Sequence, residues 1–308
     1  MRIVFLGTPE FAVPTLERLA ASPGFEVTAV VCQPDRPAGR RGELRAPAIK
    51  LAAQRLALPV HQPERLRGPE AVAWLAAQRP DALAVVAFGQ LLPAAIFDLP
   101  RLGAINAHAS LLPAYRGAAP IQWAIARGET KTGVTTMRIN AGLDTGDMLL
   151  QQAVEIGPAE TAVALGPRLA EVAAELMAET LRGLEAGTIA PRRQPAEGTL
   201  APRLSREHGR IPPAWTALEA YDGWRGFQPW PGVHVEHDGK RLAVLACHVR
   251  ASGTARAAGS LFLDGTTLTL ACAEGTALAL DTVRLEGRQP LSGPDFARGA
   301  RLAVTSQA

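Results

Sequence analysis

Three polar residues of this chain could together activate a carbonyl-like carbon: an asparagine, a histidine and an aspartate. Asn106 and His108 lie two apart at the end of an apolar run, so on a β-strand their side chains would point to one face. An amide and an imidazole can donate to a developing oxyanion, while His108 or Asp144 handles the proton of the nucleophile. A hydrogen bond from the Asp144 carboxylate to His108 would fix the tautomer of the histidine and favour its charged form. No serine or cysteine accompanies the three as an obvious nucleophile, which favours direct attack by an amine of the substrate.

Each residue also has a structural explanation. A histidine at a strand end is more often a satisfied structural group, and Asp144 before Thr145 and Gly146 fits an Asx turn. Asp-Thr-Gly is also the aspartic-protease tripeptide, but that chemistry needs two aspartates sharing a proton, and the chain has one copy.

The elements that would position these residues follow an alternating pattern. Apolar runs at 2–6 and 27–31 flank a helical pattern, which predicts a β-α-β opening. Residues 82–88 are apolar without alternation, as expected of a parallel strand covered on both faces, and 104–108 is the next strand. The expected fold is α/β, doubly wound and Rossmann-like, with a mainly parallel sheet. In such a sheet, loops 88–93, 106–117 and 140–147 would meet at one edge.

The first turn reads Gly7-Thr8-Pro9 and lacks the second glycine of the dinucleotide-binding fingerprint. A nicotinamide or flavin cofactor is therefore disfavoured.

The pattern changes in the last third of the chain. An amphipathic helix is expected at 161–185, ended by Gly187. Residues 189–210 are rich in proline and arginine and indicate a linker. Short strands and Gly-containing turns over 211–308 predict a small, OB-like antiparallel β-barrel. The expected division is thus a catalytic domain at 1–188, a basic linker and a C-terminal barrel domain.

Composition indicates a soluble globular protein of 308 residues, with 47% hydrophobic and 20% charged residues. No window has the roughly 18 apolar residues of a membrane-spanning helix, and the N-terminus does not resemble a signal peptide, so we expect a cytoplasmic protein without membrane contact. The three cysteines have neither a disulfide pattern nor metal-ligand spacing. His234 and His237 would face opposite sides of a strand, so we expect no metal.

Charge is concentrated in one segment. Lys+Arg against Asp+Glu is 18 to 18 over 1–188, 5 to 2 over 189–210 and 9 to 9 over 211–308. Residues 33–47 form a long expected loop with four arginines, a side chain suited to phosphate. The alternative is an ordinary solvated loop in a chain with an arginine-rich composition.

These motifs together resemble the 10-formyltetrahydrofolate-dependent formyltransferases, and within them the branch that acts on methionyl-tRNA. The resemblance is carried by Asn106-Ala107-His108, the stretch 110–120, and Gly142-Leu143-Asp144-Thr145-Gly146-Asp147-Met148. Similar motifs occur at 7–11 and 33–40, and at Phe227-Gln228-Pro229-Trp230-Pro231-Gly232 in the second domain.

The resemblance implies transfer of the formyl group of 10-formyltetrahydrofolate, a donor substrate that leaves as tetrahydrofolate, to the amino group of methionyl initiator tRNA in translation initiation. It implies a catalytic set of Asn106, His108 and Asp144, and an RNA partner rather than DNA. The implied folate-binding residues are Phe88, Gly89, Gln90, Leu91, Leu92, Pro93, Ser110, Leu111, Leu112, Pro113, Asn140 and Gly142. The implied tRNA-binding residues are Arg36, Arg40, Arg41, Arg45, Arg192, Arg193, Arg203 and Arg206.

Two other functions share parts of this pattern. A sister formyltransferase acting on an amino sugar nucleotide would have the same first domain, but it would not need the arginine loop, the linker or the barrel. A non-catalytic RNA-binding protein would not need the three catalytic residues. One departure from the family lies inside the motif, where Ala109 stands at a usual glycine. A methyl group there would be costly if the backbone required a positive φ.

Overall fold

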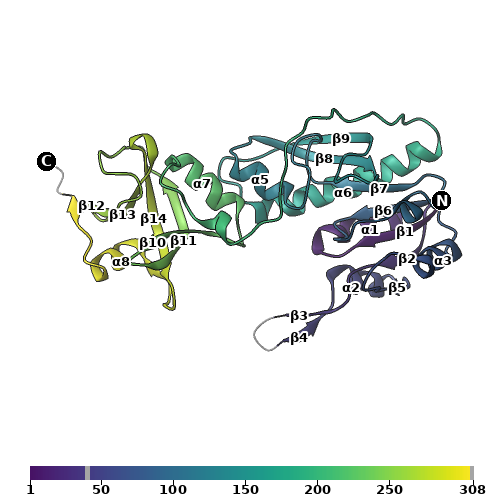
Figure 1. Cartoon of the computed structure of the whole chain (residues 1–308), viewed down its shortest axis with the longest axis horizontal. Helices are drawn as coiled ribbons and strands as arrows, with labels where there is room; N and C mark the ends of the chain where they lie inside the picture. Colours follow the sequence, from purple (N-terminus) through teal and green to yellow (C-terminus); the bar gives the residue numbers. More distant parts are fainter. Residues whose placement is uncertain (39–41, 306–308) are drawn as a thin grey trace. The chain divides into compact units, whose positions relative to one another are not determined.

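The structure is a computed structural model that describes residues 1–38 and 42–305. It forms two compact units (Figure 1). The first comprises Met1–Pro120, Lys131–Glu155 and Leu165–Ala201, and the second comprises Ile121–Thr130, Ile156–Ala164 and the chain from Pro202 onward.

A seven-stranded sheet forms the centre of the first unit. In spatial order its strands are β5 (Val60–His61), β2 (Glu26–Val31), β1 (Arg2–Gly7), β6 (Ala82–Val86), β7 (Ala104–His108), β8 (Lys131–Arg138) and β9 (Met148–Glu155). The five strands from β5 to β7 run parallel, whereas β8 is antiparallel to β7 and β9 is antiparallel to β8. The prediction of an α/β fold with a mainly parallel sheet is confirmed.

Burial explains why the central strands are apolar throughout. Every residue of β6 is buried, as are residues 3–7 of β1. Side chains on one face of these strands, including Val4 and Leu83, pack against Leu75 and Ile96. These two residues come from α3 (Pro69–Ala77) and α4 (Ala94–Phe97). Ile3 and Phe5, which alternate with Val4, are fully buried as well, so both faces of the sheet are covered.

The remaining helices follow the expected pattern closely. They are α1 (Val13–Ala21), α2 (Ala48–Arg55), α5 (Pro120–Ala126) and α6 (Ala162–Glu185), with a 3₁₀ turn at Glu10–Ala12. The predicted long helix is thus confirmed to within a residue, and Gly187 follows its end with φ +68°, the left-handed conformation of a helix C-terminal glycine. Among the described residues, no helix has the length and hydropathy needed to cross a membrane.

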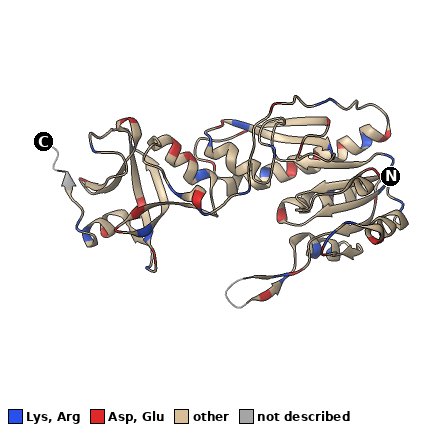
Figure 2. Ribbon diagram, viewed as in Figure 1, with Lys and Arg blue, Asp and Glu red and all other residues tan. Residues whose placement is uncertain are grey.

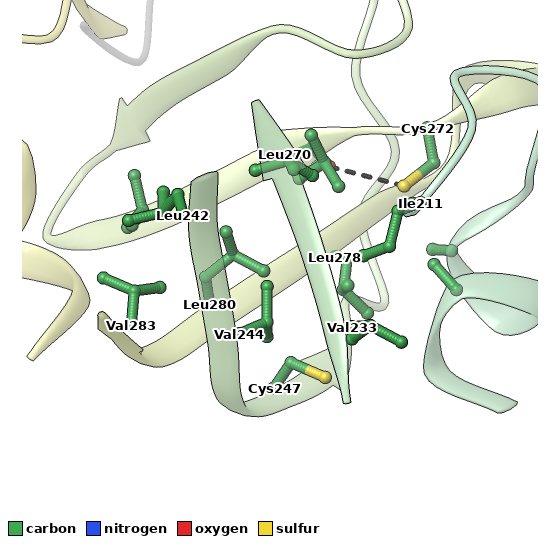
Figure 3. Packing of buried hydrophobic residues seen from close by; sticks show 14 of the residues in the cluster. Ile211, Val233, Leu242, Val244, Cys247, Leu270, Cys272, Leu278, Leu280 and Val283 are labelled. Carbon is green, nitrogen blue, oxygen red and sulfur yellow. Dashed lines mark hydrogen bonds between the residues drawn. The ribbon is translucent and has the colours of Figure 1, made fainter. Parts of the chain in front are cut away.

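A second, mostly antiparallel sheet forms the core of the second unit, as expected of a small barrel-like domain. Its strands in spatial order are β10 (Val233–His237), β11 (Lys240–Val249), β14 (Ala277–Leu285), β13 (Thr267–Ala271), β12 (Leu261–Asp264) and β16 (Val304–Thr305), with β15 (Leu291–Ser292) beside β14. The helices are α7 (Ala217–Gly226) and α8 (Gly293–Gly299), with 3₁₀ turns at Glu207–Gly209 and Ala273–Gly275. Figure 3 shows the aliphatic core of this unit, which includes Leu242, Leu278 and Leu280.

One expected loop contains regular structure. Within 33–47, β3 (Arg36–Ala38) and β4 (Glu43–Arg45) form an antiparallel pair separate from the main sheet. All three residues of β4 are exposed, including Leu44, as are Arg36 and Pro37 of β3. The alternation of apolar and polar residues that marks a half-buried strand is therefore missing from this sequence.

Candidate active site

The end of β7 presents the asparagine and the histidine to one face, as expected. Pairing places Asn106 between Val85 of β6 and Met137 of β8, and His108 opposite Thr135. His108 is 6% exposed and Asn106 is half-buried. In the described part of the chain, the Asn106 amide makes no hydrogen bond, so it is available to a ligand.

The turn after β7 fixes the protonation pattern of the histidine. The backbone N–H of Ser110 donates to the His108 carbonyl (2.9 Å), and the Ser110 hydroxyl donates to the Ala114 carbonyl (2.6 Å). The chain then bends back so that His108 Nε2 lies 2.8 Å from the Tyr115 carbonyl oxygen. A carbonyl can only accept, so Nε2 carries a proton and donates it. In a neutral His108, Nδ1 is therefore the unprotonated nitrogen.

Asp144 reaches the histidine by a different route from the one we expected. Because β8 is antiparallel, its last residue Arg138 pairs with Ile105, and the loop after β8 begins near the opposite end of β7 from His108. The loop nevertheless brings Asp144 Oδ2 to 3.7 Å from His108 Nδ1 and to 2.9 Å from the Gly117 backbone N–H, which donates to it. The expectation that Asp144 fixes the histidine tautomer by a hydrogen bond is wrong: the Tyr115 carbonyl does so, and Asp144 faces the other ring nitrogen.

Glycines allow the close approaches on which this arrangement depends. A Cβ on Gly146 would lie 1.8 Å from the Arg138 carbonyl oxygen, and a Cβ on Gly117 would lie 2.6 Å from that of Ala201. Gly117 also has φ +120°. Ala109, in contrast, is buried with a negative φ, so the alanine at this position causes no backbone strain.

A segment of the expected linker borders the site. The Gln194 amide donates to the carbonyls of Asp144 (2.9 Å) and Gly146 (2.7 Å), and its oxygen accepts from the guanidinium of Arg116. The Thr199 hydroxyl accepts from the Tyr115 backbone N–H (2.8 Å). Sequence analysis missed both residues, because they lie in a polar, proline-containing stretch without periodicity. Arg116 stood inside the family motif without an assigned role.

The twelve expected folate-binding residues fall into different environments. Phe88 and Leu92 are buried in the core of the first unit, whereas Leu91 is 81% exposed. The Gln90 amide bonds to the backbone of Leu66 and Glu64.

Most other members of that set lie in the two loops around the catalytic residues, and Gly89 and Pro93 lie in the loop after β6. Ser110 and Leu112 are buried, and the Leu112 N–H donates to the Thr135 hydroxyl (3.1 Å). Asn140 is exposed, and its side-chain oxygen accepts from the Gly142 N–H (3.0 Å). The remaining members are Leu111 and Pro113 in the turn after β7.

The arginines expected to contact tRNA are exposed wherever the structure describes them. Arg36 pairs with Glu64 (2.9 Å), Arg192 donates to the Gln151 side chain (2.7 Å), and Arg45 lies in β4. Arg193, Arg203 and Arg206 are also exposed, and Arg40 and Arg41 lie outside the described residues. Figure 2 shows acidic and basic residues interspersed over the second unit, in agreement with its balanced charge.

The three thiols are not nucleophiles. All are buried, and burial raises the pKa of Cys32 and Cys272 to about 11 and that of Cys247 to about 12, so each is protonated at neutral pH. Among the described residues, no three or more His, Cys, Asp or Glu side chains are grouped so as to hold a metal ion.

The mainly parallel α/β sheet thus carries an amide without a hydrogen bond among the described residues, a histidine with a fixed tautomer and a nearby carboxylate, an arrangement suited to group transfer. Residues 1–181 match the family model described as formyl transferase, and residues 203–301 match the formyl transferase C-terminal domain. The chain belongs to the formyl transferase family, which confirms the resemblance seen in its motifs.

Relatives similar over the whole chain include two named methionyl-tRNA formyltransferase. That of Acidobacterium capsulatum is 51% identical over 305 residues, covering 98% of both chains, and that of Solibacter usitatus is 52% identical, covering 98% of this chain and 96% of the relative.

Solved structures support the fold at low identity. A sugar 3N-formyl transferase, WlaRD, superimposes with a TM-score of 0.66 at 15% identity, covering 94% of this chain and 99% of that one. HypX from Aquifex aeolicus in complex with tetrahydrofolic acid gives 0.61 at 16% identity and covers 99% of this chain. This chain spans about half the length of HypX, 48%.

Proposed function

We propose that this protein transfers the formyl group of 10-formyltetrahydrofolate to the free amino group of methionyl initiator tRNA. One observation carries the proposal: Asn106, His108 and Asp144 converge at the end of β7 in a chain about half identical, end to end, to relatives named methionyl-tRNA formyltransferase. The tetrahydrofolate complex of HypX supports a folate donor.

The reaction joins the methionyl nitrogen to the formyl carbon, breaks the bond from that carbon to N10 of the folate, and moves one proton from the amine to the leaving nitrogen. The Asn106 amide has a free donor for the oxyanion of the tetrahedral intermediate. A donor of this kind is worth on the order of 3 kcal/mol of transition-state stabilisation.

The fixed tautomer assigns the proton transfer to one atom. His108 donates from Nε2 to the Tyr115 carbonyl, so its Nδ1 takes the proton of the attacking amine and later returns it to the folate nitrogen. The carboxylate of Asp144, 3.7 Å from Nδ1, stabilises the imidazolium formed in between. No covalent enzyme intermediate is needed.

We further assign the folate pocket to the loops at 88–93, 110–113 and 140–142. We assign tRNA contacts to the arginines of residues 36–45 and to Arg192, Arg193, Arg203 and Arg206, and the exposure of those that the structure describes suits phosphate contacts. In this proposal the chain acts in the cytoplasm, and its catalytic, linker and barrel domains divide near 188 and 210.

The test compares three acceptors with one labelled formyl donor: methionyl initiator tRNA, uncharged tRNA plus free methionine, and an amino sugar nucleotide. We expect labelled product with methionyl-tRNA alone. Label on the amino sugar alone would instead identify a sugar formyltransferase. The control is His108→Ala, which should abolish transfer while tRNA binding stays nearly unchanged. Unchanged transfer in His108→Ala would contradict the catalytic assignment.

A further inference from the structure

We infer that Gln194, held by the buried guanidinium of Arg116, is a positioning residue for the catalytic pair. The inference deepens the proposed function and rests on it, because its effect is assigned to Asp144 and His108. No motif marks Gln194, which lies in the segment that we expected to be a linker.

The hydrogen bonds of Gln194 determine the orientation of its amide. Nε and Nη2 of Arg116 both donate to Oε1 of Gln194, at 3.1 and 2.9 Å, and a guanidinium can only donate. The amide nitrogen must therefore face the two carbonyls of Asp144 and Gly146, which can only accept. Both amide hydrogens and both oxygen lone pairs are satisfied, so the side chain has one favourable orientation.

Arg116 is itself fixed by the same segment. It is 7% exposed, and it also donates from Nη2 to the Pro195 carbonyl (2.8 Å) and from Nη1 to the Ala196 carbonyl (3.2 Å). A buried guanidinium with these acceptors is costly to move, because movement would leave a desolvated charge without partners. Arg116 and Gln194 thus form a rigid clamp.

The clamp reaches both catalytic groups through adjacent residues. Tyr115, before Arg116, supplies the carbonyl that binds His108 Nε2, and Gly117, after Arg116, supplies the N–H that binds the Asp144 carboxylate. Asp144 has φ +51°, a left-handed conformation that non-glycine residues adopt rarely, although aspartate adopts it more readily than most. The bond from Gln194 to the Asp144 carbonyl acts at that residue.

Two variants separate positioning from mere stabilisation of the fold. Gln194→Met removes all of the amide hydrogen bonds at similar length. Gln194→Glu keeps oxygens for Arg116 but loses the two donors to Asp144 and Gly146. Gln152→Met is the matched control, since Gln152 is an exposed glutamine on β9.

For both Gln194 variants we expect kcat to fall about 10-fold to 100-fold, as for a small misplacement of catalytic groups. The KM values for methionyl-tRNA and folate should stay within about 3-fold, because the effect is confined to the transition state. The ring ¹⁵N chemical shifts of His108, assigned with His108→Ala and recorded at one pH, should move in both variants and not in Gln152→Met.

Other outcomes overturn the inference or the proposed function separately. An unchanged kcat, or a fall in kcat with wild-type His108 shifts, would show that Gln194 does not act through the catalytic pair. A lowered melting temperature with unchanged kcat and shifts would make it a structural residue only. If the wild-type protein forms no formyl-methionyl-tRNA, the proposed function fails, while the NMR comparison still tests whether Gln194 positions His108.

Discussion

At the scale of single residues, the site depends on which nitrogen of His108 is left free. The Tyr115 carbonyl occupies Nε2, so only Nδ1 can exchange a proton with a substrate, and Asp144 faces that nitrogen without a hydrogen bond. In the proposed mechanism Asp144 therefore acts through its charge, while its position is maintained by the N–H of Gly117.

Because Asp144 contributes its charge while Gly117 holds its position, the effect of Asp144→Asn can be predicted. The amide oxygen can still accept from Gly117, so the loop should keep its conformation, but the negative charge beside Nδ1 is lost. We expect kcat to fall roughly 10²–10⁴-fold, the range typical of general acid–base catalysis, with folate KM changed little. Steady-state kinetics on methionyl-tRNA provide the measurement.

The matched control is Asp147→Asn, which removes the same charge from the same loop. It should retain activity within about 3-fold, since we assign no role to that carboxylate. Comparable losses in Asp144→Asn and Asp147→Asn would mean that the overall charge of the loop matters, not its position beside His108.

At the scale of secondary-structure elements, the loop between β8 and β9 depends on a glycine. A side chain at Gly146 would meet the backbone oxygen of Arg138 at 1.8 Å, and neither partner can rotate away. Gly146→Ala should therefore lower the free energy of unfolding by about 1–3 kcal/mol, as overpacking does, and should displace Asp144. Urea denaturation and kcat measure the two effects.

Gly166→Ala is the comparison for that variant. Gly166 lies within α6 just before Pro167, and apart from its chain neighbours no atom lies within 4 Å of its Cβ position. Alanine there should change the free energy of unfolding by less than about 1 kcal/mol, because helix propensity favours it while the following proline disfavours a Cβ, and kcat should be unchanged. Equal stability of the two alanine variants would show that the close approach at Gly146 is tolerated.

The sequence predicted elements well wherever burial leaves a pattern. The uninterrupted apolar run of β6 and the amphipathic face of α6 follow from what each element packs against. The direction of β8 leaves no such mark, because burial influences which residues a strand carries and not whether the strand runs parallel or antiparallel to its neighbour. The sequence thus correctly predicted that Asp144 lies near His108, but it did so by assuming that the loop after β8 starts at the same edge of the sheet as the end of β7, which is wrong.

The sequence also failed to predict the residues that support the site, for a related reason. Gln194 donates to two backbone carbonyls and Thr199 accepts from one backbone N–H, and such bonds require no periodicity or particular composition in the sequence. A polar stretch that lies along a catalytic site is compositionally the same as a solvated linker.

At the scale of the whole molecule, net charge gives little attraction for RNA. The chain carries +3, and the excess lies in 189–210, so binding must depend on local groups of arginines. One such group lies in the sequence of residues 36–45, which contains four arginines.

This localisation predicts the behaviour of Arg40→Ala and Arg41→Ala. Each should raise the KM for methionyl-tRNA and reduce the slope of its logarithm against log salt by about 1, as expected for one lost phosphate contact. Folate KM should change far less. Activity measured across a salt series provides both quantities.

Arg55→Ala serves as the control, since Arg55 is an exposed arginine of α2 paired with Glu17 (3.0 Å) and outside the proposed tRNA surface. It should leave the salt slope unchanged. If the hairpin variants impair folate and tRNA use equally, the hairpin shapes the active site and does not contact RNA.

Residues 194–201 also determine how short a fragment of this chain can be and still contain every contact of the site. Nascent chains emerge from the ribosome in order, so Arg116 and Asp144 are synthesised well before Gln194 and Thr199 can bond to them. Until then the Arg116 guanidinium lacks its acceptors. An expression fragment ended at 188 would retain that defect permanently, whereas one that continues through Ala201 would include every contact of the clamp.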